Sequence, residues 1–315
     1  MKVGVIGLGN VGGKLAASIL RNGFELTVHE LDRNTAAGLL EQGAAWADTP
    51  LELASRAEVV ITCLPSPEAS AAVMEGDNGV LGGLGSGDVW LEMSTTHEDE
   101  VRRLGERVTA TGAFALDSPV SGGCHRAATG NISIFVGGER AAFDRALPVL
   151  QCMGRRILHT GPIGSASVLK VITNYLASVH LSALGEAWVV ASKAGLDLAM
   201  TYEGIKASSG NSFVHETESQ IILNGSYDIN FTLDLVLKDL GLFEGVAERH
   251  GVPVEMARLV RGQFADAQQR YGERAWSPTI VKRLEDDCGV ALRAPGFPAE
   301  LIDDEPEEPG REVTP

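Results

Sequence analysis

The sequence contains a glycine pattern that could bind phosphate close to its beginning. Residues 7–12 have the G-x-G-x-x-G spacing, directly after a short apolar run and directly before a helical pattern. In that context the glycines let the backbone approach a pyrophosphate at the positive N-terminus of the helix. The residues predicted to bind the cofactor here are Gly7, Leu8, Gly9, Asn10, Val11 and Gly12.

An acidic residue follows at the position that selects between dinucleotides. Glu30 lies 23 residues after Gly7, at the end of the next apolar run, where an acid can accept a hydrogen bond from the adenosine ribose 2′-hydroxyl. A carboxylate there repels a 2′-phosphate and therefore favours NAD over NADP. Arg33 is near enough to hold such a phosphate, and Glu30 could also be a solvated acid at a strand end. We expect NAD.

Two further groups could act on a substrate. Lys170 and Asn174 are four residues apart in a helical pattern and therefore share one face. A lysine inside the apolar stretch 168–176 is unusual, because burial of an unpaired ammonium is costly, although its head could instead reach solvent. Ser121 with Gly122 and Gly123 could expose backbone N–H groups as an anion nest, or could form only a tight turn.

The elements that must position these residues form two patterns. Up to about residue 160, short apolar runs alternate with helical patterns, which predicts a doubly wound, Rossmann-type α/β domain over residues 1–160. The runs show little apolar/polar alternation, as expected for strands buried on both faces. The predicted strands are Lys2–Ile6, Glu25–His29, Val59–Cys63, Val89–Met93, Ala113–Asp117 and Ile132–Val136.

The rest of the chain is helical in pattern. Residues 163–194 predict one long amphipathic helix that links the first domain to an all-helical domain over residues 161–295. The other predicted helices are Met200–Ser208, Leu233–Arg249, Val254–Tyr271 and Pro278–Cys288. Residues 296–315 are rich in acids and prolines and cannot bury apolar surface, so we predict a disordered acidic tail there.

Composition excludes several classes of partner. The 315 residues are 44% hydrophobic and carry a formal net charge of −16, which disfavours nucleic acid and anionic membrane surfaces. No stretch of about 18 apolar residues predicts a membrane span. The four cysteines form no CxxC pair and the seven histidines no ligand spacing, so neither disulfides nor a metal site is expected. A reducing, cytoplasmic location fits best.

Four separated motifs, in order, resemble those of the β-hydroxyacid dehydrogenase family, which includes 3-hydroxyisobutyrate dehydrogenase and tartronate semialdehyde reductase. The resemblance extends from Met1 to about residue 290. The motifs are GLGNVG at 7–12, DSPVSGG at 117–123, GPIGSASVLKVITN at 161–174 and KDLGL at 238–242.

The resemblance implies roles for individual residues. Lys170 would be the catalytic lysine, and Asn174 would support it or bind substrate. Lys238 would approach both nicotinamide and substrate. The substrate carboxylate would be bound by Ser121, Gly122 and Gly123, and further dinucleotide contacts would come from Leu64, Pro65 and Thr95. The site would lie between the two domains, and a homodimer or homotetramer is expected.

The resulting functional hypothesis is an oxidoreductase that transfers a hydride between NAD and a small 3-hydroxy acid, or its semialdehyde, with Lys170 as general acid or base. One alternative is a decarboxylating enzyme related to 6-phosphogluconate dehydrogenase, and another is a catalytically silent NAD-binding sensor. Imine reductases share the fold but usually lack the lysine.

Arg126 departs from the family pattern, which has a glycine there, and it follows His125. Arg126 would either point to solvent or enter the substrate pocket. In the pocket, its guanidinium would favour a substrate with a polar or acidic substituent.

Overall fold

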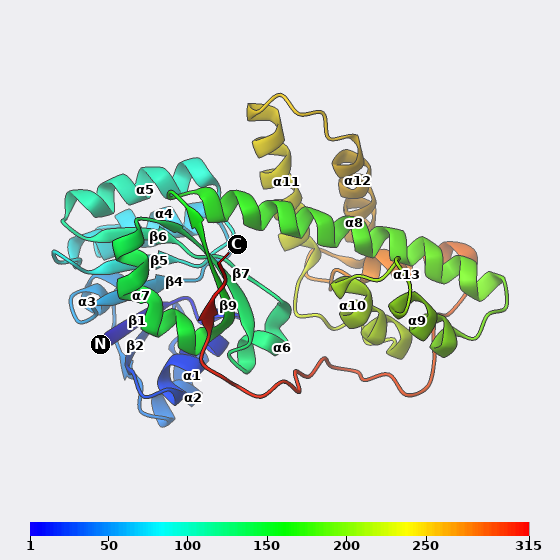
Figure 1. Ribbon diagram of the computed structural model, residues 1–315, viewed down its shortest axis with the longest axis horizontal. Coiled ribbons are helices and arrows are strands. Elements are labelled where there is room, and N and C mark those ends of the chain that lie inside the picture. Colours follow the sequence, from blue (N-terminus) through cyan, green and yellow to red (C-terminus); the bar gives the residue numbers. More distant parts are fainter. Residues whose placement is uncertain (315) are drawn as a thin grey trace. The chain divides into compact units, whose positions relative to one another are not determined.

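The computed structural model describes residues 1–314 of the chain, which divide into two compact units (Figure 1). The first unit, called the N-terminal unit, comprises Met1–Lys170 together with the segment that begins at Asp303. The second, called the helical unit, comprises Val171–Ile302. The chain therefore leaves the N-terminal unit after Lys170 and returns to it at Asp303.

The N-terminal unit is built on one twisted sheet. Strands β3-β2-β1-β4-β5-β6 are adjacent in that order and all parallel, which is the strand order of a doubly wound dinucleotide-binding fold. Beyond β6, strands β8, β9 and β10 run in the opposite direction, and β7 pairs with β8. The strands are β1 (Lys2–Ile6), β2 (Glu25–His29), β3 (Ala45–Trp46), β4 (Val59–Thr62), β5 (Val89–Glu92), β6 (Phe114–Asp117), β7 (Val120–Ser121), β8 (Ile132–Gly138), β9 (Gly154–Gly161) and β10 (Arg311–Glu312).

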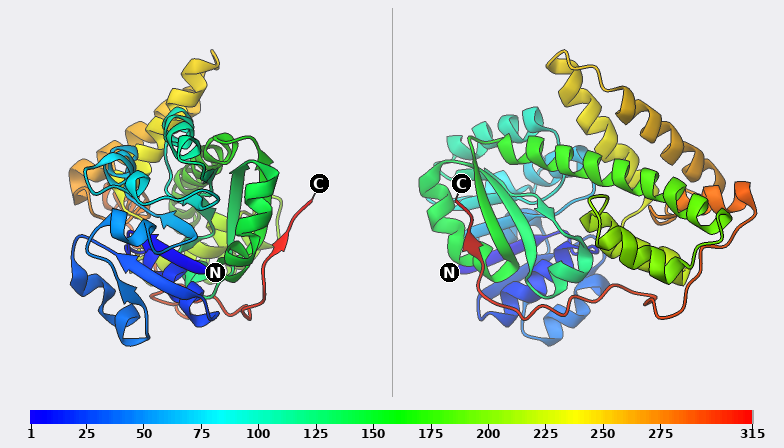
Figure 2. Two further views of the ribbon diagram at one scale, coloured as in Figure 1. Left: turned by 90° about the vertical axis from the view of Figure 1, so that its left-hand side faces the viewer. Right: turned by 45° about the vertical axis from the view of Figure 1, so that its right-hand side comes forward.

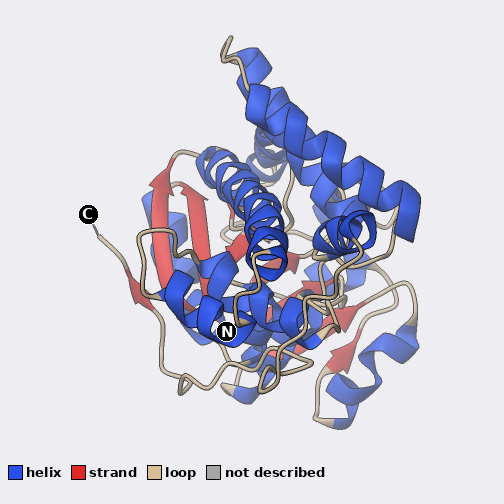
Figure 3. Cartoon of the chain, turned by 90° about the vertical axis from the view of Figure 1, so that its right-hand side faces the viewer, coloured by secondary structure: helices blue, strands red, loops and turns tan. Residues whose placement is uncertain are grey.

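Helices cover both faces of this sheet (Figure 3). Successive residues of the central strands point to opposite faces, so Leu91 belongs to one buried apolar cluster and its neighbour Trp90 to another. Both β4 and β5 are buried along their whole length, which explains their continuous apolar runs. The helices are α1 (Gly12–Arg21), α2 (Ala37–Glu41), α3 (Pro50–Ala54), α4 (Pro67–Glu75), α5 (Glu98–Ala110), α6 (Gly123–Ala128) and α7 (Arg140–Met153), with short 3-10 turns η1 (Arg33–Ala36) and η2 (Val80–Gly82).

The helical unit surrounds a core in which Trp188 and Phe264 are fully buried. Long helix α8 begins in the N-terminal unit and continues into this one. The helices are α8 (Ser165–Lys193), α9 (Leu198–Lys206), α10 (Phe213–Asn224), α11 (Leu233–Arg249), α12 (Glu255–Tyr271) and α13 (Thr279–Cys288). In the described part of the chain, no helix is long and apolar enough to cross a membrane.

The predicted fold class is confirmed, and the main corrections concern segments without an apolar pattern. Short strands β3 and β7, strand β9 between β8 and β10, and helix α10 were not predicted. The prediction of a disordered tail is wrong for residues 303–314. These residues lie along the N-terminal unit (Figure 2), and β10 pairs in parallel with β9. Acidic side chains of this segment meet basic partners far away in the sequence, which composition alone does not reveal.

Candidate active site

The glycine turn between β1 and α1 has the geometry that a dinucleotide requires. Gly7 has φ +93°, and a Cβ there would lie 2.3 Å from the backbone oxygen of Cys63. A Cβ on Gly12 would lie 2.0 Å from the oxygen of Gly7, so this glycine allows the helix to start against the strand. A Cβ on Gly9, by contrast, would meet no atom within 4 Å. The turn is closed on the protein side and open at Gly9, which fits a pyrophosphate approaching the backbone.

Glu30 lies directly after β2, beside this turn. One carboxylate oxygen accepts a hydrogen bond from the Leu8 N–H at 2.7 Å, and the other accepts from the Leu31 N–H at 2.8 Å. The carboxylate is therefore fixed next to the glycine turn. The guanidinium of Arg33 lies 5.3 Å from the centre of the Trp46 ring, a cation–π distance.

The residues that follow β4 and β5 form the next part of the same edge. The Leu64 N–H donates to the Ser94 hydroxyl at 2.7 Å, and the Ser94 N–H donates to Glu92 at 2.9 Å. Glu92 is 1% exposed, and burial raises the pKa of its carboxyl although Ser94 opposes the shift. Pro65 and Thr95 flank these contacts in sequence. The parallel strands thus bring together at one edge the residues predicted to contact the dinucleotide.

The predicted substrate loop leaves β6 at the same edge. Ser121 lies in β7 and pairs with β8, while Gly122 and Gly123 have φ +130° and +87°. Side-chain-bearing residues rarely adopt these conformations, which explains both glycines. The His125 ring folds back over Gly123, and burial, with help from Arg126, lowers the pKa of that histidine.

The Arg126 side chain packs beside Gly122 and forms an ion pair with Glu305. Its aliphatic chain lies 3.4 Å from where a Cβ on Gly122 would be, and its guanidinium is 3.4 Å from a carboxylate oxygen of Glu305. The sequence left two alternatives for Arg126, solvent or the substrate pocket, and neither included an acidic partner from the C-terminal segment.

Asp117 joins the start of this loop to helix α8, a role that its place in the sequence did not indicate. This carboxylate is fully buried, and burial raises its pKa against the effect of the hydrogen bonds it accepts. It accepts from the Gly164 N–H at 2.8 Å, the Ser167 N–H at 2.7 Å and the Ser167 hydroxyl at 2.9 Å. The first turn of α8 is thereby fixed one turn before Lys170.

Lys170 and Asn174 follow on the same helix. Lys170 is 8% exposed, so of the two alternatives left open by its apolar flanks, burial is the one that the structure has. The Asn174 side-chain NH₂ donates to Asp239 at 2.5 Å, and the other carboxylate oxygen of Asp239 lies 2.9 Å from the Lys238 ammonium. Asp239 is only 3% exposed. The helical unit thus joins the predicted site residues Asn174 and Lys238 through Asp239, a role that the sequence did not indicate. The sequence feature that could have revealed Asp239 is an acid within the largely apolar stretch 233–242.

Comparisons with known proteins agree with this geometry. Residues 2–161 match the family model described as the NAD-binding domain of 6-phosphogluconate dehydrogenase. Residues 164–284 match the model described as the NAD-binding domain of NADP-dependent 3-hydroxyisobutyrate dehydrogenase. The chain belongs to the β-hydroxyacid dehydrogenase family.

Individual members of the β-hydroxyacid dehydrogenase family match along most of their length. The 3-hydroxyisobutyrate dehydrogenase of Pseudomonas aeruginosa is 34% identical over 270 residues, covering 84% of this chain and 91% of the relative. The 2-(hydroxymethyl)glutarate dehydrogenase of Eubacterium barkeri is 30% identical over 293 residues, covering 93% of this chain and 97% of the relative. The crystal structure of 3-hydroxyisobutyrate dehydrogenase from Salmonella typhimurium superposes with a TM-score of 0.82 at 28% identity, covering 90% of this chain and 99% of that one.

Membership makes the chain an oxidoreductase with a pyridine-nucleotide-binding domain. Within residues 1–314, no cluster of three or more potential metal-ligating side chains occurs.

Proposed function

We propose that this protein is an NAD-dependent dehydrogenase of a small 3-hydroxy acid, or the reductase of the matching semialdehyde. The observation that carries the proposal is the placement of Lys170 on α8. The turn before it is anchored by Asp117, and the turn after it carries Asn174, which is held by buried Asp239. A buried amine on a helix fixed at both sides suits a proton-transfer group.

The chain's own residues would perform the following steps. The Ser121 hydroxyl and the N–H groups of Gly122 and Gly123 bind the substrate carboxylate. The Lys170 amine accepts the proton of the 3-hydroxyl group as the hydride leaves the carbon that bears this hydroxyl. In the reverse direction, Lys170 returns a proton to the oxygen. Asn174 orients the Lys170 amine, and Lys238 adds positive charge near the substrate. The bound dinucleotide supplies the hydride acceptor or donor.

The same proposal includes a preference for NAD. Glu30 is fixed by the Leu8 and Leu31 N–H groups, so its negative charge cannot easily move away from a 2′-phosphate. Arg33 already has the Trp46 ring as a partner. Both observations favour a free ribose 2′-hydroxyl.

A homodimer or homotetramer is also part of the proposal. Within the helical unit, α9 and α12 expose large apolar side chains that a partner subunit would cover, among them Met200 at 71% and Leu259 at 59% exposure. Light scattering at micromolar concentration tests this directly, and a stable 33 kDa particle would contradict it.

The function is tested by an absorbance assay of NADH and NADPH formation with a panel of 3-hydroxy acids. The panel contains 3-hydroxyisobutyrate, analogues with polar and acidic substituents, and 6-phosphogluconate as the decarboxylating alternative. Turnover of a 3-hydroxy acid with NAD supports the proposal. Release of CO₂ from 6-phosphogluconate alone, or tight NADH binding without turnover of any member, contradicts it.

A further inference from the structure

The segment 303–314, called the strap, crosses back onto the N-terminal unit after the helical unit. The matches to the family models end at residue 284, so the strap lies outside both of them. Five of its acidic side chains have partners on the N-terminal unit: Asp303, Glu305, Glu307, Glu308 and Glu312.

The end of the strap is attached to the sheet edge. The Gly310 N–H donates to the Gln151 carbonyl at 2.7 Å, and the Gln151 side chain donates back to the Gly310 carbonyl at 3.0 Å. β10 then pairs with β9, and Glu312 accepts two hydrogen bonds from Arg140, at 2.6 and 2.9 Å. Backbone pairing and a bidentate ion pair anchor this end independently of the substrate loop.

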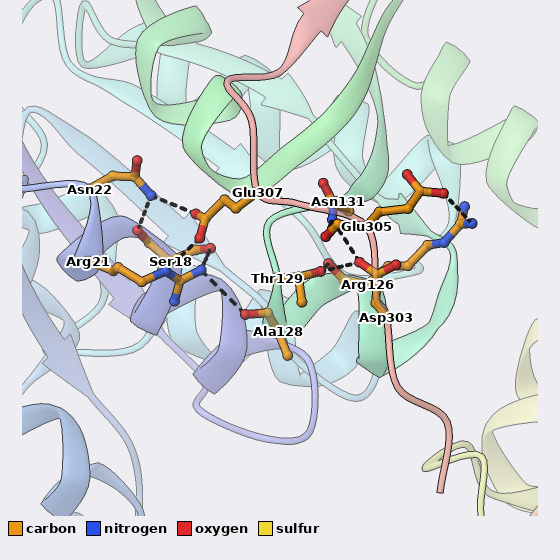
Figure 4. Close-up of polar contacts among 10 residues, drawn as sticks. All are labelled: Ser18, Arg21, Asn22, Arg126, Ala128, Thr129, Asn131, Asp303, Glu305 and Glu307. Carbon is orange, nitrogen blue, oxygen red and sulfur yellow. Dashed lines mark hydrogen bonds and ion pairs between the residues drawn. The ribbon is translucent and has the colours of Figure 1, made fainter. Parts of the chain in front are cut away.

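The beginning of the strap contacts the end of α6 instead (Figure 4). One carboxylate oxygen of Asp303 accepts from both the Thr129 hydroxyl and the Asn131 side chain, the latter at 2.7 Å. Asn131 also donates to the Glu305 carbonyl at 2.9 Å, and the Glu305 carboxylate pairs with Arg126.

These contacts continue into the substrate loop through α6. The Asn131 N–H donates to the Arg126 carbonyl at 2.8 Å, closing the end of the helix, and the Thr129 hydroxyl oxygen lies 3.2 Å from the same carbonyl oxygen. Helix α6 begins at Gly123, and the Arg126 side chain lies against Gly122. Helix α6 has only six residues, so the contacts at its end lie within about two turns of the glycines at its start.

We propose that the strap positions the substrate loop, with Asp303 as the main positioning residue and Glu305 acting through Arg126, so that it sets the affinity for the substrate carboxylate. The inference rests on the proposed function of Ser121, Gly122 and Gly123. It assigns Arg126 to the strap instead of to the substrate.

The test compares the two ends of the strap in the full-length chain. The double substitution Asp303→Ala and Glu305→Ala removes the contacts to α6, whereas Glu312→Ala removes an ion pair at the other end. We expect the double variant to raise KM for the 3-hydroxy acid by about 3- to 10-fold, the scale of losing a charge-assisted hydrogen bond in part. KM for NAD and kcat should stay within about twofold, and Glu312→Ala should change none of the three.

Equal KM values for the acid in the double variant and in Glu312→Ala would overturn the proposal. A parallel rise in KM for NAD would also overturn it, because that pattern indicates a general loss of structure in the unit.

Amide hydrogen exchange supplies a measurement that needs no turnover. Exchange in residues 120–131 should be faster in the double variant than in Glu312→Ala, while α8 exchanges equally in both. If no 3-hydroxy acid is turned over, the proposed function fails but the exchange result still decides whether the strap holds the loop. Unchanged exchange in 120–131 would refute the positioning role.

Discussion

Two buried aspartates act on helix α8 in different ways. Asp117 is fully buried and accepts hydrogen bonds from backbone N–H groups and a hydroxyl in the first turn of the helix. Asp239 is 3% exposed and contacts the side chains of Asn174 and Lys238. Asp117 satisfies the helix start and fixes the helix, whereas Asp239 fixes the Asn174 side chain on that helix and contacts Lys238 on α11. A buried carboxylate near a site therefore need not serve the chemistry; its partners indicate its role.

The largest effect is expected for Lys170, which lies between the residues held by the two aspartates. Lys170→Met should lower kcat by roughly 10²–10⁴-fold through loss of general acid–base catalysis. NADH binding, measured by fluorescence titration, should survive. Lys193→Met, the same change at the exposed end of α8, is the control and should leave kcat unchanged. Turnover of Lys170→Met within threefold of the parent would rule out the proposed mechanism.

Asp239→Asn should come next. The amide keeps the size of the side chain but removes the charge that binds Asn174 and Lys238. We expect kcat to fall by roughly 10- to 100-fold, the scale of a hydrogen bond to a charged group, with little change in the midpoint of thermal unfolding. A large loss of stability with normal kcat would mean that Asp239, like Asp117, serves the fold.

Asp117→Asn tests the other half of the comparison. An amide can no longer accept at both oxygens, so a buried N–H of α8 loses its acceptor. The free energy of unfolding should fall by about 1–3 kcal/mol, measured by denaturant titration. The matched control is Asp144→Asn, because that exposed aspartate forms only a surface ion pair with Arg140 and should change stability by less than about 1 kcal/mol. A loss no greater than that of the control would show that Asp117 does not anchor α8.

The smallest effect is expected for a substitution of Glu30. It binds backbone N–H groups, as Asp117 does, and under the proposed function it would also accept a hydrogen bond from the adenosine ribose. Glu30→Ala should narrow the NAD/NADP ratio of kcat/KM by about tenfold, or about 1.4 kcal/mol. An unchanged ratio would show that the carboxylate only fixes the glycine turn, and a parent enzyme that prefers NADP would mean that Arg33 outweighs Glu30.

Much of this protein follows from the sequence by itself. The glycine spacing and the apolar runs predicted β1 and β2 with the bounds that the structure has, and helical periodicity did the same for α11. These features depend on neighbouring residues, because backbone preference and side-chain period are local properties.

Only the tertiary structure decided the features that depend on distant partners. Strand β9 has adjacent arginines and becomes a strand because β8 and β10 pair with it. Asp239 meets Asn174 across 65 residues. The strap is acidic and proline-rich, so its composition indicates disorder. It is ordered because Arg21, Arg140 and the end of α6 supply complementary charges and donors from far away in the sequence. Complementarity of charge belongs to a pair of segments, and a local pattern contains only one of them.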